Sequence, residues 1–267
     1  MLEAASVIRQ IRTHTSGTAL WWLGNAGWAL KSDNVLLLID PVIEMSEDDP
    51  TLSEIDLPLV HELPLRASEL FEDDLDLCLV SHAHGDHLAR RTIPTLARRT
   101  RCRFVVPESC RETMRRLGIP EDRMIAARHG QPVVHQQVTI EPVKALHGHL
   151  YGSVYREANL GDCGYLIRDG RWTIFHPGDS VLLHEHLEMP PPEVFLVSIT
   201  EHNFWVRNTA LLANLWKPRY ILPMHYGTYR EPLFWTIGDP EAVRPHLDEA
   251  VRPSFRPLRQ GERLLLE

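Results

Sequence analysis

The segment His82 to His87 carries three histidines and one aspartate, and it limits what this chain can be more than any other feature. Only Ser81 separates it from the apolar run 75–80, which predicts a buried strand. Imidazole and carboxylate groups are ligands that Zn²⁺, Mn²⁺ and Fe²⁺ accept, and alternate residues leaving a strand can turn two rings toward one ion. A helix expected from Leu88 onward would point its N-terminal N–H groups at the same place. The pattern predicts a metal site at the carboxyl edge of a sheet; a solvated, histidine-rich loop is the alternative.

Three further segments end in side chains that can bind a metal. His147 and His149 stand two positions apart after a predicted strand, although a pair of surface histidines explains them equally well. Asp179 follows a Pro-Gly turn, where a carboxylate can bridge two cations or cap a helix expected from about Val181. His225 ends another predicted strand, and alone it would more often be a buried structural histidine. With one histidine counted from the pair His147 and His149, the four strand ends supply five histidines and two aspartates, the ligand count of a dinuclear site.

The rest of the chain reads as a single α/β domain without a linker. Short apolar runs predict an antiparallel meander at its start, followed by strands that alternate with helices. The predicted strands are 18–23, 27–31, 35–39, 75–80, 103–106, 132–134, 138–143, 164–167, 172–175, 194–199 and 220–222, and the predicted helices are 89–99, 108–117 and 209–216. No Gly/Ser-rich or charged low-complexity segment divides the 267 residues.

Residues 42–64 carry seven acidic residues and no Lys or Arg, a composition that predicts a loop. A loop of this length in a compact domain is more often a lid or a binding loop than idle chain, although a surface excursion explains it nearly as well. We expect it to cover part of the pocket and to disfavour strongly anionic substrates. We also expect replacement of residues 47–54 by a short Gly/Ser bridge to leave thermal stability nearly unchanged.

Composition narrows the range of partners. The formal net charge of −8 offers no basic surface to long nucleic acids. No apolar run reaches membrane-spanning length, and the N-terminus lacks the apolar core of a signal peptide. The cysteines show no Cys-x-x-Cys spacing, which predicts reduced structural thiols and a cytoplasmic location: Cys78, Cys102, Cys110 and Cys163. A small-molecule substrate is the expected partner, and a homo-oligomer is compatible with the sequence.

The metal-binding motifs and the segments around them resemble the metallo-β-lactamase superfamily of hydrolases. The resemblance runs through nearly the whole chain and is carried by 22–27, Ile39-Asp40-Pro41, the His82 to His87 motif, His147, Gly178-Asp179 and Pro223-Met224-His225-Tyr226. The Ile-Asp-Pro, His-Pro-Gly-Asp and Pro-Met-His-Tyr-Gly-Thr phrases look most like the branch related to L-ascorbate-6-phosphate lactonase. The resemblance implies a four-layer αβ/βα sandwich, formed by one domain over residues 1–267, with its metals at one edge.

The resemblance also implies how the ligands divide between two divalent ions. The first ion would be held by His82, His84 and His147, the second by Asp86, His87 and His225, and Asp179 would bridge them. His84 stands where redox-active diiron members carry Glu, which favours Zn or Mn, with Fe as the less suitable alternative. True β-lactamases carry a ligand Cys whose nearest equivalent here is Asp179, so antibiotic hydrolysis is disfavoured.

Such a site predicts a hydrolase that attacks an ester, lactone or related acyl bond with a metal-bridging hydroxide. Asp86 is the predicted catalytic residue, because it could hold the attacking water or carry its proton. The predicted substrate contacts are Asn203, Tyr226 and His149, with His202 and Tyr229 as further candidates for leaving-group protonation or oxyanion contact. A phosphodiesterase on the same metals and a non-catalytic metal-binding regulatory protein are the alternatives.

Overall fold

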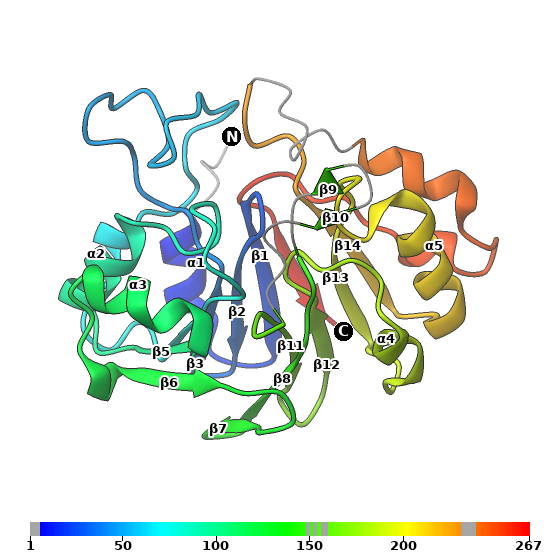
Figure 1. The fold of residues 1–267 in the computed structure, drawn as a ribbon, viewed down its shortest axis with the longest axis horizontal. Coiled ribbons are helices and arrows are strands. Elements are labelled where there is room, and N and C mark those ends of the chain that lie inside the picture. The colour runs from blue at the N-terminus through cyan, green and yellow to red at the C-terminus, as the bar shows by residue number, and fades with distance from the viewer. Residues whose placement is uncertain (1–5, 148–149, 152–153, 156–159, 231–238) are drawn as a thin grey trace.

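The structure is a computed structural model that describes residues 6–147, 150–151, 154–155, 160–230 and 239–267 (Figure 1). The helices are α1 (Val7–Thr13), α2 (Thr92–Arg99), α3 (Arg111–Arg116), α4 (His184–Glu188) and α5 (Trp205–Trp216). The strands are β1 (Thr18–Gly24), β2 (Gly27–Ser32), β3 (Val35–Ile39), β4 (Leu77–Leu79), β5 (Arg103–Pro107), β6 (Met124–Ala127), β7 (Val133–His135), β8 (Val138–Lys144), β9 (Leu150–Tyr151), β10 (Val154–Tyr155), β11 (Cys163–Arg168), β12 (Thr173–His176), β13 (Val194–Ser198), β14 (Tyr220–Met224) and β15 (Arg263–Leu266).

Two mixed sheets face each other. The first has the strand order β15-β1-β2-β3-β4-β5-β6, the second has the order β14-β13-β12-β11-β8-β7, and β9 pairs with β10 apart from both. In the first sheet β15 to β3 are antiparallel and β3 to β6 are parallel. In the second sheet β7 to β12 are antiparallel and β12 to β14 are parallel. The two halves of the chain therefore follow one plan: an antiparallel meander that continues into parallel strands.

Helices cover the outer faces of both sheets (Figure 1). The side chains of β1 alternate: Leu20 and Trp22 enter the core between the sheets, whereas Trp21 packs toward α1, α2 and α3. On the other side α5 and the 3-10 segment Pro240–His246 cover the second sheet. Because both faces of each sheet are buried, the central strands read as continuous apolar runs. The predicted four-layer αβ/βα sandwich is confirmed.

Most predicted elements are present, with shifted ends. The helix expected over 89–99 begins only at Thr92, and the helix expected over 108–117 is divided into a 3-10 turn, Glu108–Cys110, and α3. The helix expected from about Val181 begins at His184 as α4. One helix and four strands were not predicted: α1, β6, β9, β10 and β15. They have two to seven residues each, too few for a clear period, and a helix as short as α1 depends on tertiary packing.

The acidic segment 42–64 is tied to the body of the domain. Its Glu54 carboxylate accepts hydrogen bonds from the backbone N–H groups of Arg91 (2.7 Å) and Thr92 (3.0 Å), at the start of α2. Leu59 forms a bridge with Tyr229, just beyond β14. The expectation that the first N–H groups of this helix point at the histidine cluster is therefore wrong, because Glu54 accepts them. Since Glu54 belongs to the stretch 47–54, we now expect replacement of that stretch to lower stability.

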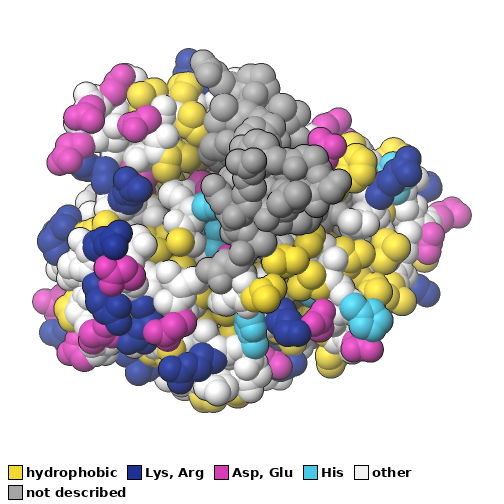
Figure 2. All heavy atoms as spheres, viewed as in Figure 1, with side chains coloured by type: hydrophobic (Ala, Val, Ile, Leu, Met, Phe, Trp, Pro, Cys, Tyr) yellow, Lys and Arg dark blue, Asp and Glu magenta, His cyan; other side chains and the backbone are white. Residues whose placement is uncertain are grey.

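The remaining sequence expectations concern the thiols and the surface. All four cysteines are buried and free, as predicted, and burial raises the pKa of Cys163 to about 12. None of the helices in the described ranges is both long and apolar enough to span a bilayer. On the face drawn in Figure 2, basic side chains are interspersed with acidic ones around α2 and α3.

Candidate metal centre

The histidine motif forms a tight turn beyond the carboxyl end of β4. The backbone N–H groups of His87 and Leu88 both donate to the carbonyl oxygen of His84, at 3.0 and 2.7 Å. This turn gathers the rings of the motif, so that the ring centroids of His82 and His84 are 4.7 Å apart and those of His82 and His87 are 4.0 Å apart. The short spacing in sequence thus becomes one compact cluster of imidazoles.

The other three strand ends bring their side chains to this cluster. His147 follows β8, and its ring centroid lies 4.9 Å from that of His82. Asp179 follows β12, and its Oδ2 lies 3.5 Å from His87 Nε2. His225 directly follows β14, and its ring stacks on His87 at 5.4 Å. All seven side chains predicted as ligands therefore meet where the strand ends of both sheets converge.

Within the cluster the candidate ligand atoms fall into overlapping groups whose members lie within 4.8 Å of one another. Two groups match the predicted division: His82, His84 and His147 in one, and Asp86, His87 and His225 in the other. Asp179 joins a third group with His82 and His87, and a fourth with His147 and His202. Asp179 thus has neighbours on both sides, as expected of a bridging group.

Glycine allows Asp179 to approach the motif so closely. Gly178 has φ +61°, and a Cβ atom there would lie 2.9 Å from Ser81 Cβ and 3.1 Å from the carbonyl oxygen of Cys163. Only a residue without a side chain fits between the two turns in this backbone conformation. The Pro-Gly turn before Asp179 therefore brings the second sheet into contact with the motif on the first.

Several candidate ligand atoms are buried without a hydrogen-bond partner, as expected of atoms that bind a cation. His87 Nε2, His225 Nε2 and Asp179 Oδ1 are buried and make no hydrogen bond. His225 Nε2 lies 2.8 Å from Asp179 Oδ1, but the pair lacks hydrogen-bond geometry. Buried polar atoms are rarely left unsatisfied unless a site has a further occupant. The nitrogen and oxygen donors of this set, without sulfur, fit divalent metal ions.

Charge is unevenly spread over the cluster. Burial alone would raise the pKa of Asp179, but His225 and His87 outweigh burial and hold that pKa well below its usual range. Burial lowers the pKa of His82 well below its usual value, with help from His87 and His147, and it lowers the pKa of His147 to about 4. These two imidazoles are therefore neutral at pH 7, the form in which histidine binds a metal.

Asp40 supports the cluster from behind, and the sequence pattern assigned it no role of its own. It lies at the end of β3 with φ +44° and is fully buried. Its carboxylate accepts hydrogen bonds from the backbone N–H of Ser81 (2.7 Å) and from His87 Nδ1 (2.8 Å). A histidine whose Nδ1–H is held by a carboxylate presents its Nε2 lone pair to the opposite side. The signal that could have revealed this role is the polar Asp40 directly after an apolar strand.

The predicted substrate contacts have other partners in the structure. Asn203 is buried, and its Nδ2 donates to Ser198 Oγ (2.7 Å) and Thr200 Oγ1 (2.9 Å). The hydroxyl of Tyr226 donates to the carbonyl oxygen of Leu258, and its ring stacks on Trp22 at 4.5 Å. Contact of Asn203 or Tyr226 with a substrate stays a prediction, and His149 lies outside the described residues.

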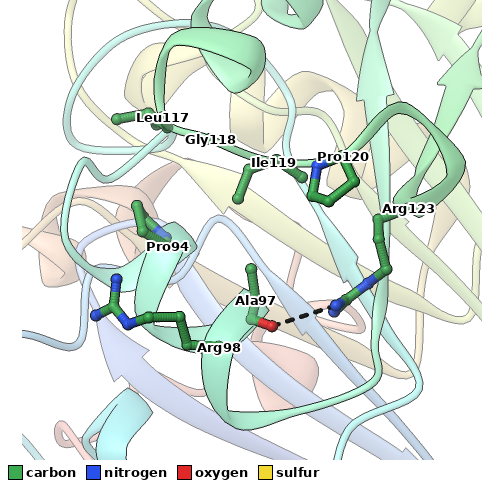
Figure 3. Close-up of a pocket in the computed structure, with 8 residues that line it drawn as sticks. All are labelled: Pro94, Ala97, Arg98, Leu117, Gly118, Ile119, Pro120 and Arg123. Atoms are coloured by element: carbon green, nitrogen blue, oxygen red, sulfur yellow. Dashed lines mark hydrogen bonds between the residues drawn. The ribbon is translucent and has the colours of Figure 1, made fainter.

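A cavity of about 300 Å³ lies apart from this cluster, between α2 and the segment after α3 (Figure 3). Two arginines, Arg98 and Arg123, line it, and Arg123 donates to the carbonyl oxygens of Ala97 (3.2 Å), Thr100 (3.2 Å) and Cys102 (2.7 Å). The guanidinium thus stabilises the end of α2 and its connection to β5. No metal-binding side chain lines the cavity, so the histidine cluster is the candidate functional site.

Known proteins share both the sequence and the fold. The family model described as "Beta-lactamase superfamily domain" matches residues 36–226. A UPF0173 metal-dependent hydrolase from Desulforamulus reducens is 30% identical over 251 residues, which cover 91% of this chain and 97% of that protein. A UPF0173 metal-dependent hydrolase from Hyperthermus butylicus is 28% identical over 233 residues, covering 85% and 90%.

Solved structures agree in fold at lower identity. A metallo hydrolase from Ignicoccus hospitalis superposes with a TM-score of 0.67 at 22% identity, covering 94% of this chain and 98% of the other. An isothiocyanate hydrolase from Delia radicum gut bacteria superposes with a TM-score of 0.72 at 17% identity, covering 93% and 99%. The family model and the relatives, together with the clustered histidines and aspartates, lead to one conclusion: this chain belongs to the β-lactamase superfamily and is a metal-dependent hydrolase.

Proposed function

We propose that this hydrolase cleaves an ester, lactone or related acyl bond of a small molecule at a pair of divalent metal ions. His82, His84 and His147 would hold one ion, Asp86, His87 and His225 the other, and Asp179 would lie between them. The observation that carries the proposal is the meeting of these seven side chains, with His87 Nε2, His225 Nε2 and Asp179 Oδ1 buried and not hydrogen bonded.

Two ions bound there would supply a water of lowered pKa and an electrophilic contact for the carbonyl oxygen. Asp86 is the residue we assign to hold the attacking water and to take up its proton, because its side chain is 16% exposed whereas those of His87 and His225 are fully buried. We assign contact with the leaving group to His202, because its ring centroid lies 5.6 Å from that of His147.

The donor set supports Zn or Mn as the resident metal. It combines imidazole with carboxylate and contains no thiolate, and such sets suit these ions. We keep Fe as the alternative. The resemblance to the branch related to L-ascorbate-6-phosphate lactonase stays a prediction about kinship, and it assigns no substrate to this chain.

A small, uncharged substrate fits the surroundings of the site. The acidic segment 42–64 reaches the metal motif, since Ile55 Cγ2 would lie 3.8 Å from a Cβ atom on Gly85. The seven acidic residues of this segment would repel a strongly anionic substrate. The structural similarity to an isothiocyanate hydrolase from Delia radicum gut bacteria adds isothiocyanates to the compounds worth testing, because their central carbon is also attacked by water.

The test is a parallel assay of lactones, aryl esters, thioesters, isothiocyanates and bis-aryl phosphates, with metal content measured on the same sample. We expect two metal equivalents per chain and metal-dependent turnover of a carbonyl or isothiocyanate compound. Faster cleavage of the phosphodiesters would favour the phosphodiesterase alternative, and full occupancy without turnover would favour a regulatory protein. A single equivalent, with His225 and Asp179 outside coordination distance, would refute the dinuclear site.

The expected setting of the enzyme is likewise proposed. Four buried, free cysteines support a reducing cytoplasm. The formal net charge of −8 supports a small-molecule partner over nucleic acid. Assembly into a homo-oligomer is compatible with both.

A further inference from the structure

Asn25 lies in the turn between β1 and β2, and its contacts reach two of the candidate ligands. It is 2% exposed and has φ +47°. Its carbonyl oxygen accepts a hydrogen bond from the backbone N–H of His225 (3.1 Å). Its side-chain Nδ2 donates to Asp86 Oδ2 and to the Asp86 carbonyl oxygen, both at 3.2 Å. One residue of the first sheet thus contacts candidate ligands that belong to different halves of the chain.

These contacts concern one of the two ligand groups. Asp86 and His225 belong to the same group, whose third member, His87, is held by Asp40. The hydrogen bonds described for Asn25 go to Asp86 and His225 and to no ligand of the group that contains His82. Ser81 Oγ, by contrast, lies near both groups, 3.0 Å from His82 Nδ1 and 3.2 Å from His87 Nδ1. A change at Asn25 should therefore disturb one group and spare the other.

The backbone of Asn25 is itself fixed, so that its side chain has a defined starting point. Its N–H donates to Thr228 Oγ1 (2.7 Å), and its carbonyl oxygen also accepts from Trp22 Nε1 (3.1 Å). His225 has φ +62°, a left-handed conformation that the bond to Asn25 helps to hold. The turn therefore sets the position from which His225 leaves β14.

The side chain is not explained by stability alone. Asn25 Oδ1 is buried and accepts no hydrogen bond, and a buried unsatisfied acceptor is unfavourable. Rotation of the amide by 180° would place this oxygen against the oxygens of Asp86, so the present orientation is the one in which a donor faces the carboxylate. The amide therefore limits the rotation of the Asp86 carboxylate, whose side chain is 16% exposed.

We propose that Asn25 is a positioning residue that sets the affinity of the Asp86, His87 and His225 group for its metal ion, and has little effect on the His82, His84 and His147 group. The inference rests on the proposed dinuclear site. Residues that orient a ligand without touching the metal typically change metal affinity by about 10- to 100-fold when they are replaced.

Two variants isolate the side chain. Asn25→Gly retains all three backbone hydrogen bonds, to Thr228, His225 and Trp22, and glycine adopts positive φ without strain. Asn25→Asp retains the shape but loses the donor and places a second carboxylate beside Asp86. The matched control is Gln136→Gly, at an exposed residue with φ +50° in the turn between β7 and β8.

The measurement is a Co²⁺ titration of the metal-free proteins, followed by visible absorption and by competition with a chelator. We expect both Asn25 variants to bind one equivalent as the wild type does and the other about 10- to 100-fold more weakly, with a change in only one of the two sets of absorption bands. The control should bind both equivalents normally.

Equal weakening of both equivalents, or no weakening of either, would refute the role of Asn25. Loss of folding in both variants would also refute it, because the retained backbone bonds would then not suffice for the turn. If the wild type binds a single equivalent, the proposed dinuclear site fails instead, and the two failures are thereby told apart.

Discussion

At the scale of single residues, Asp179 joins the two ligand groups. We predict that Asp179→Asn lowers kcat by about 10²-fold or more, because the site loses a main electrostatic element. The variant should bind metal more weakly but keep nearly the same free energy of unfolding in the metal-free state, since the amide retains the shape of the side chain. The measurements are steady-state kinetics and metal content of the purified variant.

Asp169 offers the matched control for Asp179. It is also buried, and its carboxylate accepts from Thr18 Oγ1 (2.5 Å) and from the backbone N–H of Trp172 (2.8 Å). Asp169→Asn should therefore lower the free energy of unfolding by about 1–3 kcal/mol while both metal equivalents remain. The bridging role would be disproved if Asp179→Asn kept two equivalents and normal kcat.

We predict that His186 on α4 lowers the free energy of unfolding in acid. Burial lowers its pKa to about 4 in the folded protein, whereas an unfolded imidazole titrates near 6.5. Protonation is thus harder in the folded state, so the contribution to stability is complete above pH 6.5 and is lost as the pH falls toward 4. The effect reaches up to about 3 kcal/mol at the acid end.

The test for His186 compares urea unfolding at pH 7.5 and pH 5.0. We expect the difference in the free energy of unfolding between the two pH values to shrink in His186→Gln. It should persist in His184→Gln, which changes an exposed histidine on the same helix. An equal acid sensitivity of His186→Gln and the wild type would assign the effect to other groups.

At the scale of elements, Glu54 connects the acidic segment to the start of α2. We predict that Glu54→Ala lowers the free energy of unfolding by about 1–3 kcal/mol, because the N–H groups of Arg91 and Thr92 lose their acceptor. Glu47→Ala removes only an ion pair to Arg91 from an 84% exposed carboxylate, and should change stability by less than about 0.5 kcal/mol. Urea unfolding of both variants checks the difference, and equal values would show that Glu54 is not the anchor.

The elements also show where the sequence is informative. The runs before His82, Asp179 and His225 were predictable as strands, because a buried strand is apolar and each run is followed at once by polar residues that can bind a metal. The roles of Asn25 and Glu54 were not, because each is a single polar residue whose partners lie far away in the sequence and give no periodic signal. The convergence of the strand ends came from the family resemblance rather than from any pattern within one segment.

At the scale of the whole molecule, the candidate ligands come from both sheets, so metal binding should stabilise the entire fold. Ions that bind only the folded chain at 100 times their Kd add about 2.7 kcal/mol each. We predict that a chelator lowers the unfolding midpoint in a single transition, followed by tryptophan fluorescence, to which Trp22 and Trp28 between the sheets contribute. Asp179→Asn should respond less to the chelator, and an unchanged wild-type midpoint would contradict the link between metal and fold.

The pairing of β15 with β1 has a consequence for how the protein folds during its synthesis on the ribosome. The register joins Thr18 to Leu266, so β1 receives its outer neighbour only when nearly all described strands have been translated. At ribosomal speeds of about 5–20 residues per second, the interval lasts roughly 10 to 50 s. Throughout it, the nascent chain presents the bare edge of an apolar strand, which is a template for unwanted pairing with other chains. Chaperone contact is therefore most useful to this protein during that interval, before β15 pairs with β1.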